Sequence, residues 1–193
     1  MEEARQYPAL NRRRLLASGA SIGSVLLLGC AGPEGDDNGL RPQGMLPADW
    51  AAMREPDDWH RLVLFANWDF VEPALFRRIA EQPNCDRATA LALFWKSQPE
   101  YFLEFPDRAA VPEPNRELHD LIVLIRERWQ AGAYTRAELA FDRERDAWPL
   151  DFAALERQFG ARVDQFMPRS MRGALPGRRV SEDGTDFPGV IRR

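Results

Sequence analysis

Apolar side chains repeat at intervals of three and four residues over most of the chain, in short blocks separated by Pro, Gly and Asp. An amphipathic α-helix requires that spacing, because about 3.6 residues make one turn and the apolar residues then share a face. A half-buried strand would alternate with a period of two, and no stretch shows sustained alternation between hairpin turns. We therefore expect residues 48–167 to form a small irregular all-α domain of about six to seven helices.

Breaks in this periodicity give the expected helix boundaries. Asp57 and Asp86 suit N-caps, because a carboxylate accepts hydrogen bonds from the free amides of the first turn, and Pro73 suits a first turn. Gly132 and Gly160 suit helix C-termini. Helices are thus expected after Pro47, from Asp57, from Pro73 to before Pro83, from Asp86, over residues 115–130, from the capping-box sequence at 135–138, and from Pro149 to Gly160, with a Pro-rich loop over 99–114.

The first 29 residues have the anatomy of a secretory signal. A cluster of Arg precedes fifteen uncharged residues that are rich in Leu, Ala, Gly and Ser. As a helix these fifteen residues would span about 22 Å, short of the roughly 30 Å hydrocarbon core, so they do not predict a membrane span. Arg12, Arg13, Leu15 and Leu16 resemble the twin-arginine export motif, in which two Arg, one free position and two apolar residues follow a polar residue.

Residues 27–30, Leu-Leu-Gly-Cys, resemble a bacterial lipobox. In that pattern the Cys becomes the first mature residue and carries acyl chains, so the resemblance makes Cys30 a lipid attachment point. Each buried acyl methylene contributes about 0.8 kcal/mol to membrane binding. Residues 30–47 are rich in Gly and Pro and lack apolar periodicity, which predicts a flexible linker. The expected location is the bacterial cell envelope; Ala31 favours the outer membrane, facing the periplasm, if the cell is Gram-negative.

The mature chain would carry 22 basic and 28 acidic residues, a net charge of −6. This balance gives no reason to expect a nucleic-acid-binding domain, and it favours association with a basic partner. Residues 168–193 differ, with six Arg, three acidic residues and four Gly. We expect them to form a basic, irregular and solvated tail, with contact to anionic lipid as the alternative.

Two turns and one helix resemble a known bacterial family, the domain of unknown function 4274, over about residues 59–101. The residues that carry the resemblance are Asn67-Trp68-Asp69, Gln82-Pro83-Asn84-Cys85-Asp86, Thr89-Ala90-Leu91 and Phe94-Trp95. The family has no established activity, so the resemblance implies a helical fold and no catalytic residue. Its members mostly look cytoplasmic, and a lipoprotein with a longer C-terminal half departs from them.

The shared residues are of types that build turns and cores. Asn tolerates left-handed turns, Asp accepts hydrogen bonds from free amides at helix starts, and Trp buries a large ring whose N–H needs a partner. We therefore predict a structural role for the motif residues Asn67, Trp68, Asp69, Pro83, Asn84, Cys85, Asp86 and Trp95.

Candidate chemistry centres on Cys85 and the two histidines, His60 and His119. A thiolate at a helix N-terminus can be a nucleophile, but a buried Cys behaves as a small apolar residue, and we favour core packing. The separations of these three residues match no pattern of closely paired metal ligands. Each His is interpreted as a surface or capping residue, and no cofactor, metal ion or catalytic residue is predicted.

The sequence thus favours a lipid-anchored envelope protein that binds an unidentified protein partner, with an immunity protein as the specific version. The alternatives are an uncharacterised envelope enzyme and a structural lipoprotein without a ligand. If the domain binds proteins, exposed aromatic residues of the Pro-rich loop are the expected contact site, namely Tyr101, Phe102 and Phe105.

Overall fold

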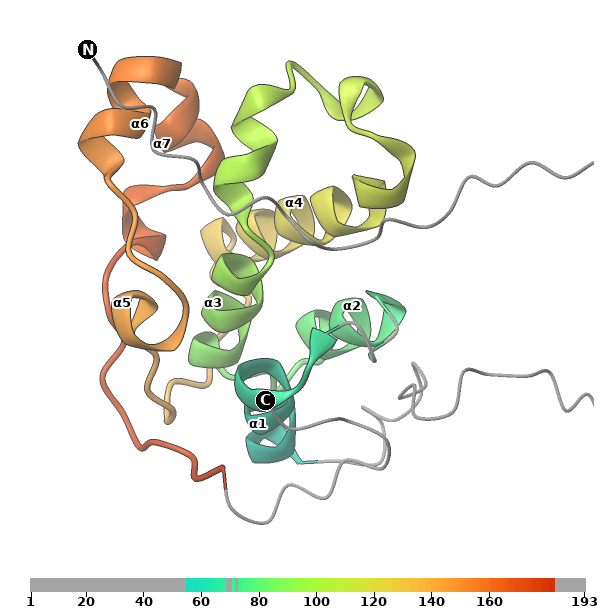
Figure 1. Ribbon diagram of the computed structural model, residues 1–193. Helices are drawn as coiled ribbons and strands as arrows, with labels where there is room; N and C mark the ends of the chain where they lie inside the picture. Colours follow the sequence, from blue (N-terminus) through green and yellow to red (C-terminus); the bar gives the residue numbers. More distant parts are fainter. Residues whose placement is uncertain (1–54, 69–70, 72, 183–193) are drawn as a thin grey trace, which may run out of the picture. The chain divides into compact units, whose positions relative to one another are not determined.

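The computed structural model describes residues 55–68, 71 and 73–182. Within these residues the chain forms α-helices and short 3-10 helices (Figure 1), and three isolated β-bridges join described residues to one another. The all-α prediction is confirmed. The α-helices are α1 (Pro56–Phe65), α2 (Pro73–Glu81), α3 (Arg87–Lys96), α4 (Arg116–Gln130), α5 (Arg143–Asp146), α6 (Phe152–Phe159) and α7 (Arg162–Phe166). The 3-10 helices are η3 (Pro99–Glu104), η4 (Arg108–Ala110), η5 (Glu113–Asn115) and η6 (Arg169–Met171).

Helix α3 is the centre of the core. Every residue from Ala88 to Trp95 is buried, so this helix has no solvent-facing stripe. A helix that is apolar all round must be covered on all sides. Helices α1, α2, α4 and α5 all contact α3 (Figure 1), and the alanines at positions 88, 90 and 92 leave room for close approach.

Most helix boundaries follow the local signals, but α1 starts two residues earlier than predicted. Asp86 caps α3, Pro73 opens α2 and Gly160 ends α6, each as expected. Helix α1 begins at Pro56 rather than after a cap at Asp57, and Asp57 lies in its first turn. Proline favours the first helical position because its fixed φ suits a helix and its missing N–H would have had no partner there.

The expected helix at 135–138 does not form. Residues 135–141 are extended and make isolated bridges to α3's N-cap and to residues near the C-terminus. The capping-box sequence is overridden because the amides of Glu138 and Leu139 donate to the buried carboxylate of Asp86 instead of to a local cap. The Pro-rich loop at 99–114 also differs, because it winds into three 3-10 turns.

The helix expected from Pro149 begins at Phe152, where Asp151 accepts a hydrogen bond from the Ala154 amide at 3.0 Å. It is not the last helix, since α7 and η6 follow it. A short amphipathic stretch such as α7 gives too few turns for periodicity to identify it.

The described part of the predicted tail, residues 168–182, is mostly irregular and largely exposed, as expected, but a few buried residues attach it to the domain. Met171 is fully buried, and its carbonyl accepts a hydrogen bond from Trp95 Nε1 at 2.8 Å. Figure 1 shows this segment running from α7 past α5 toward α1, where Arg178 pairs with Asp57 at 2.8 Å. These residues therefore belong to the folded domain.

Several predicted features lie outside the described residues. They are the export motif (Arg12, Arg13, Leu15, Leu16), Cys30, the linker at 30–47, the helix after Pro47, Asp69 and residues 183–193. Among the described helices, none has both the length and the apolar character that crossing a membrane requires.

Gly177 gives a test of how tightly this C-terminal segment is packed. A Cβ at this position would lie 2.6 Å from backbone atoms of Glu138 and Leu139, and the backbone has φ +156°. We expect Gly177→Ala to lower the free energy of unfolding by about 2 kcal/mol or more. Gly173→Ala is the matched control, because nothing lies within 4 Å of its added methyl. Equal stabilities of the two variants in urea unfolding would contradict this packing.

Candidate functional site

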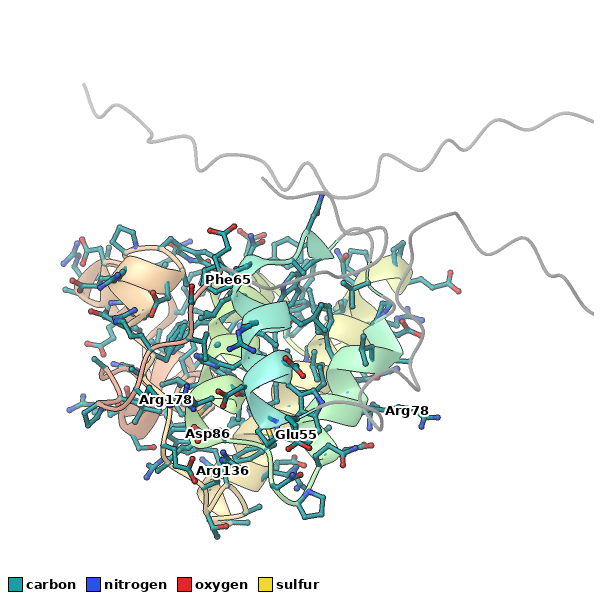
Figure 2. All side chains as sticks on the ribbon, turned by 90° about the horizontal axis from the view of Figure 1, so that it is seen from below. Glu55, Phe65, Arg78, Asp86, Arg136 and Arg178 are labelled. Atoms are coloured by element: carbon teal, nitrogen blue, oxygen red, sulfur yellow. The ribbon has the colours of Figure 1, made fainter. Side chains whose placement is uncertain are left out.

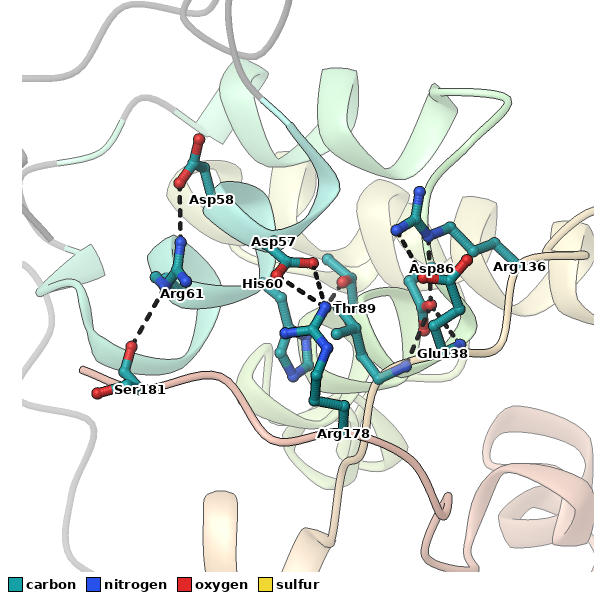
Figure 3. Close-up of polar contacts among 11 residues, drawn as sticks. Asp57, Asp58, His60, Arg61, Asp86, Thr89, Arg136, Glu138, Arg178 and Ser181 are labelled. Carbon is teal, nitrogen blue, oxygen red and sulfur yellow. Dashed lines mark hydrogen bonds and ion pairs between the residues drawn. The ribbon is translucent and has the colours of Figure 1, made fainter. Parts of the chain in front are cut away.

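The buried carboxylate of Asp86 joins two parts of the chain. Its Oδ1 accepts from the Ala88 amide at 2.8 Å, and its Oδ2 accepts from the amides of Glu138 at 2.8 Å and Leu139 at 3.3 Å. The Arg136 guanidinium lies 3.8 Å from Oδ2 (Figure 3). One side chain thus fixes the start of α3 and the extended segment 135–141 against each other.

His60 lies beside this junction and is fully buried, which corrects its prediction as a surface or capping residue. Its Nε2 is 3.2 Å from the Ala140 carbonyl, and its Nδ1 is 3.1 Å from the Thr89 hydroxyl. Because a carbonyl only accepts, Nε2 carries the proton and Nδ1 accepts from Thr89. Burial lowers the pKa of His60, so the ring is held neutral between α1, α3 and the extended segment.

Ion pairs at the surface lie next to this junction. Arg178 contacts Asp57, and Arg61 contacts Asp58 at 3.1 Å and the Ser181 carbonyl at 3.3 Å (Figure 3). Figure 2 shows Asp86, Arg136 and Arg178 close together at the edge of α1. Most of these polar groups bond to one another, although the buried Nε of Arg136 makes no hydrogen bond among the described residues, so the arrangement has the chemistry of a structural junction.

The other motif residues also have structural surroundings. Trp68 packs on Phe76 with ring centroids 4.0 Å apart and donates from Nε1 to the Val63 carbonyl at 3.1 Å. Trp95 donates to Met171, as described above. Pro83 and Asn84 occupy the exposed turn between α2 and α3.

Cys85 is completely buried beside Asp86. Removal from solvent, followed by the charge of Asp86, raises the pKa of its thiol to about 12. The thiolate is the nucleophilic form, and the raised pKa keeps this group as the thiol. Cys85 is therefore suited to core packing and not to nucleophilic attack. Within the described residues, no three His, Cys, Asp or Glu side chains are grouped to hold a metal ion.

Sequence reasoning missed a second buried acid, Glu100. Its Oε1 accepts from Trp148 Nε1 at 2.8 Å, while its Oε2 is buried and has no hydrogen-bond partner among the described residues. Burial raises the pKa of this carboxyl, and the nearby Arg143 partly opposes that effect. Arg143 is itself nearly covered by the rings of Trp95 and Phe152.

One open cavity combines cations with aromatic rings. It has a volume of about 170 Å³ and opens where the chain leaving η3 meets α4 and α7. We call it the arginine pocket, and its main lining residues are Phe102, Phe105, His119, Arg126, Arg162 and Phe166. His119, predicted as a surface or capping residue, is mostly buried and lies in its wall.

A second cavity, of about 340 Å³, is lined by Arg87, Trp129, Gly132, Tyr134 and Thr135. Here the cation is already engaged, because the Arg87 guanidinium lies 4.3 Å from the centroid of the Trp129 ring. The sequence predicted neither cavity. Its one relevant signal was the aromatic content of the loop at 99–114, in which Phe102 is buried while Tyr101 and Phe105 are partly buried.

Residues 54–130 match the family model described as Domain of unknown function (DUF4274). This segment is therefore similar to that family, and we call it the DUF4274 segment. The match confirms the family resemblance and extends it beyond residues 59–101, to the end of α4. No curated protein and no solved structure matches the chain significantly.

The DUF4274 segment depends on residues outside it. Its motif residues Asp86 and Trp95 bond to Glu138, Leu139 and Met171, all of which follow residue 130. The motif therefore holds the C-terminal half of the domain in place.

Replacing Asp86 tests this role. Both Asp86 and Asp151 cap a helix, but Asp151 is exposed and accepts only from its own helix. Asp151→Ala should cost about 1 kcal/mol of unfolding free energy, the value of a cap. Asp86→Ala should cost about 3 kcal/mol, because it also leaves two amides without an acceptor. Equal losses in denaturant unfolding would show that Asp86 acts only as a cap.

His60 gives a prediction on pH. Its folded-state pKa lies below the unfolded value of 6.5, so its contribution to stability is complete above pH 6.5 and is lost as pH falls through the lowered pKa. His60→Gln cannot titrate. From about pH 7.5 to about pH 5.5 the wild type should lose up to about 1 kcal/mol more than the variant. Parallel pH profiles of urea unfolding would contradict a neutral buried ring.

Proposed function

We propose that this protein is a lipid-anchored binding protein of the bacterial cell envelope, exported by a twin-arginine signal and attached through Cys30. The helical domain, on its linker, would present the arginine pocket to a protein partner. Support for the anchor comes from the sequence, in which the export motif and the lipobox are correctly separated.

The observation that carries the binding proposal is the contrast between the junction and the pocket. At the junction, Asp86, His60 and Arg178 have their hydrogen-bonding groups and charges matched within the chain. At the pocket, Arg162 forms no ion pair with any described carboxylate, and the nearest one to Arg126 is Glu127 at 3.8 Å. Cations beside aromatic rings at an open site are typical of groups that dominate protein interfaces.

One experiment tests both parts of the proposal. The full-length chain is expressed in a bacterial host, membranes are separated, and proteins are cross-linked within the envelope. The wild type should be recovered with the membrane and give a cross-linked adduct with a partner. Cys30→Ala should leave the membrane fraction, because one thiol carries all the acyl chains. Arg126→Gln combined with Arg162→Gln should stay in the membrane fraction and lose the adduct.

Arg157→Gln is the control, since Arg157 is exposed on α6 and lies outside the pocket, and its loss removes one of the two positive charges that the double variant loses. It should keep both membrane recovery and the adduct. Membrane recovery of Cys30→Ala would overturn the anchor, and an adduct that survives in the double variant would overturn the role of the pocket. An enzymatic role would gain support if no adduct forms in membranes that contain the wild type.

A further inference from the structure

One wall of the arginine pocket is aromatic. Phe102 and His119 have ring centroids 5.5 Å apart, His119 and Phe166 are 5.8 Å apart, and Phe105 lies at the end of η3. Rings from three elements therefore enclose one side of the cavity. Such surfaces favour a flat apolar group, because aromatic rings pack edge to face or offset against one another.

The guanidinium groups of Arg126 and Arg162 are held in position. Arg162 Nη2 donates to the Phe105 carbonyl. Arg126 Nη1 donates to the Gln165 carbonyl at 3.4 Å, and its guanidinium lies 5.6 Å from the centroid of Phe166. These contacts use one N–H group of each guanidinium, and the other N–H groups make no hydrogen bond among the described residues. Neither contact with a carbonyl neutralises the positive charge.

Arg108 differs from the two pocket arginines, because a carboxylate neutralises its charge. Arg108 makes two short hydrogen bonds to the carboxylate of Asp120, at 2.6 and 2.7 Å. Asp107, the acidic residue that lines the pocket, accepts from the Ala110 amide at 3.1 Å as the cap of η4. The pocket thus holds two cations and one carboxylate, and the carboxylate already has a structural role.

We propose that the arginine pocket binds a carboxylate carried on a flat apolar group. A guanidinium fork matches a carboxylate in geometry and charge, and the aromatic wall accommodates the apolar part. A cavity of about 150 Å³ holds a benzene ring, so the pocket has room for about one aromatic acid or one peptide residue. The ligand is therefore either a C-terminal aromatic residue of a partner or a free small aromatic acid.

This inference rests on the proposed binding function and names the chemistry of its site. Because the mature chain is negative overall, the attraction must act locally, over less than the roughly 10 Å screening length at 0.1 M salt. A suitable partner would have a basic surface and present one carboxylate. The basic surface would be attracted by the negative charge of the domain, and the carboxylate would bind in the pocket.

The test titrates the full-length protein, purified in detergent, with fluorophenylacetate and follows the fluorine NMR line. We expect saturable binding, and at least about tenfold weaker binding of the neutral isostere fluorophenylacetamide. Arg162→Gln and Arg126→Gln should each weaken binding of the acid about tenfold, whereas Arg157→Gln should leave it unchanged. The thermal unfolding midpoint of each variant checks that the domain stays folded.

Three results would overturn the proposal: absence of binding at millimolar probe, equal binding of acid and amide, and equal binding by wild type and both pocket variants. Stronger binding of inorganic phosphate than of the aromatic acid would also overturn it. An acylated dipeptide ending in phenylalanine, compared with its amide, separates a peptide terminus from a free acid as the source. The probe is added in vitro, so a failure to bind it would overturn only the proposed ligand. The proposed function is tested separately, by cross-linking in the envelope.

Discussion

The carboxylate of Asp86 is the interaction on which the arrangement of this domain depends. It lies in the interior and accepts three backbone amides, one from its own helix and two from a segment more than fifty residues later. Burying a charge is unfavourable unless hydrogen bonds replace the lost water, and here three backbone dipoles do so. Since the same group caps the central helix α3, the position of the C-terminal half is set by the helix that every other part of the core packs against.

This arrangement explains why family motif residues lie in the DUF4274 segment while their partners lie beyond it. Asp86 and Trp95 bond outward to residues 138, 139 and 171, and His60 of α1 bonds to Ala140. The C-terminal half contributes buried side chains, Phe141 and Met171 among them, to the same core. The motif looks local in sequence, but its side chains bind residues of the C-terminal half of the same domain.

A clear division separates the polar groups that hold the fold from those at the arginine pocket. The former are buried or paired within the chain, and they include His60, whose lowered pKa makes stability depend on pH. The latter lie at an opening between η3, α4 and α7, where carbonyls fix both guanidinium groups, Arg162 forms no ion pair with a described carboxylate, and Arg126 pairs only with Glu127 at 3.8 Å. That difference in pairing, rather than the presence of arginine itself, distinguishes the arginines of the candidate binding surface from the other arginines of this chain.

The sequence by itself determined the helical fold class, most helix starts and the Cys85 side chain as core, whereas the export and lipidation signals stay predictions. These depend on local spacing or on residue types that act within one turn, such as Pro73, Asp86 and Gly160. Only the tertiary structure decided that residues 135–141 are extended, that His60 is buried, and that residues 168–182 join the core. In each case a hydrogen bond to a residue far along the chain outweighed the local preference, and the pocket likewise exists only because residues 102–166 fold back to share one opening.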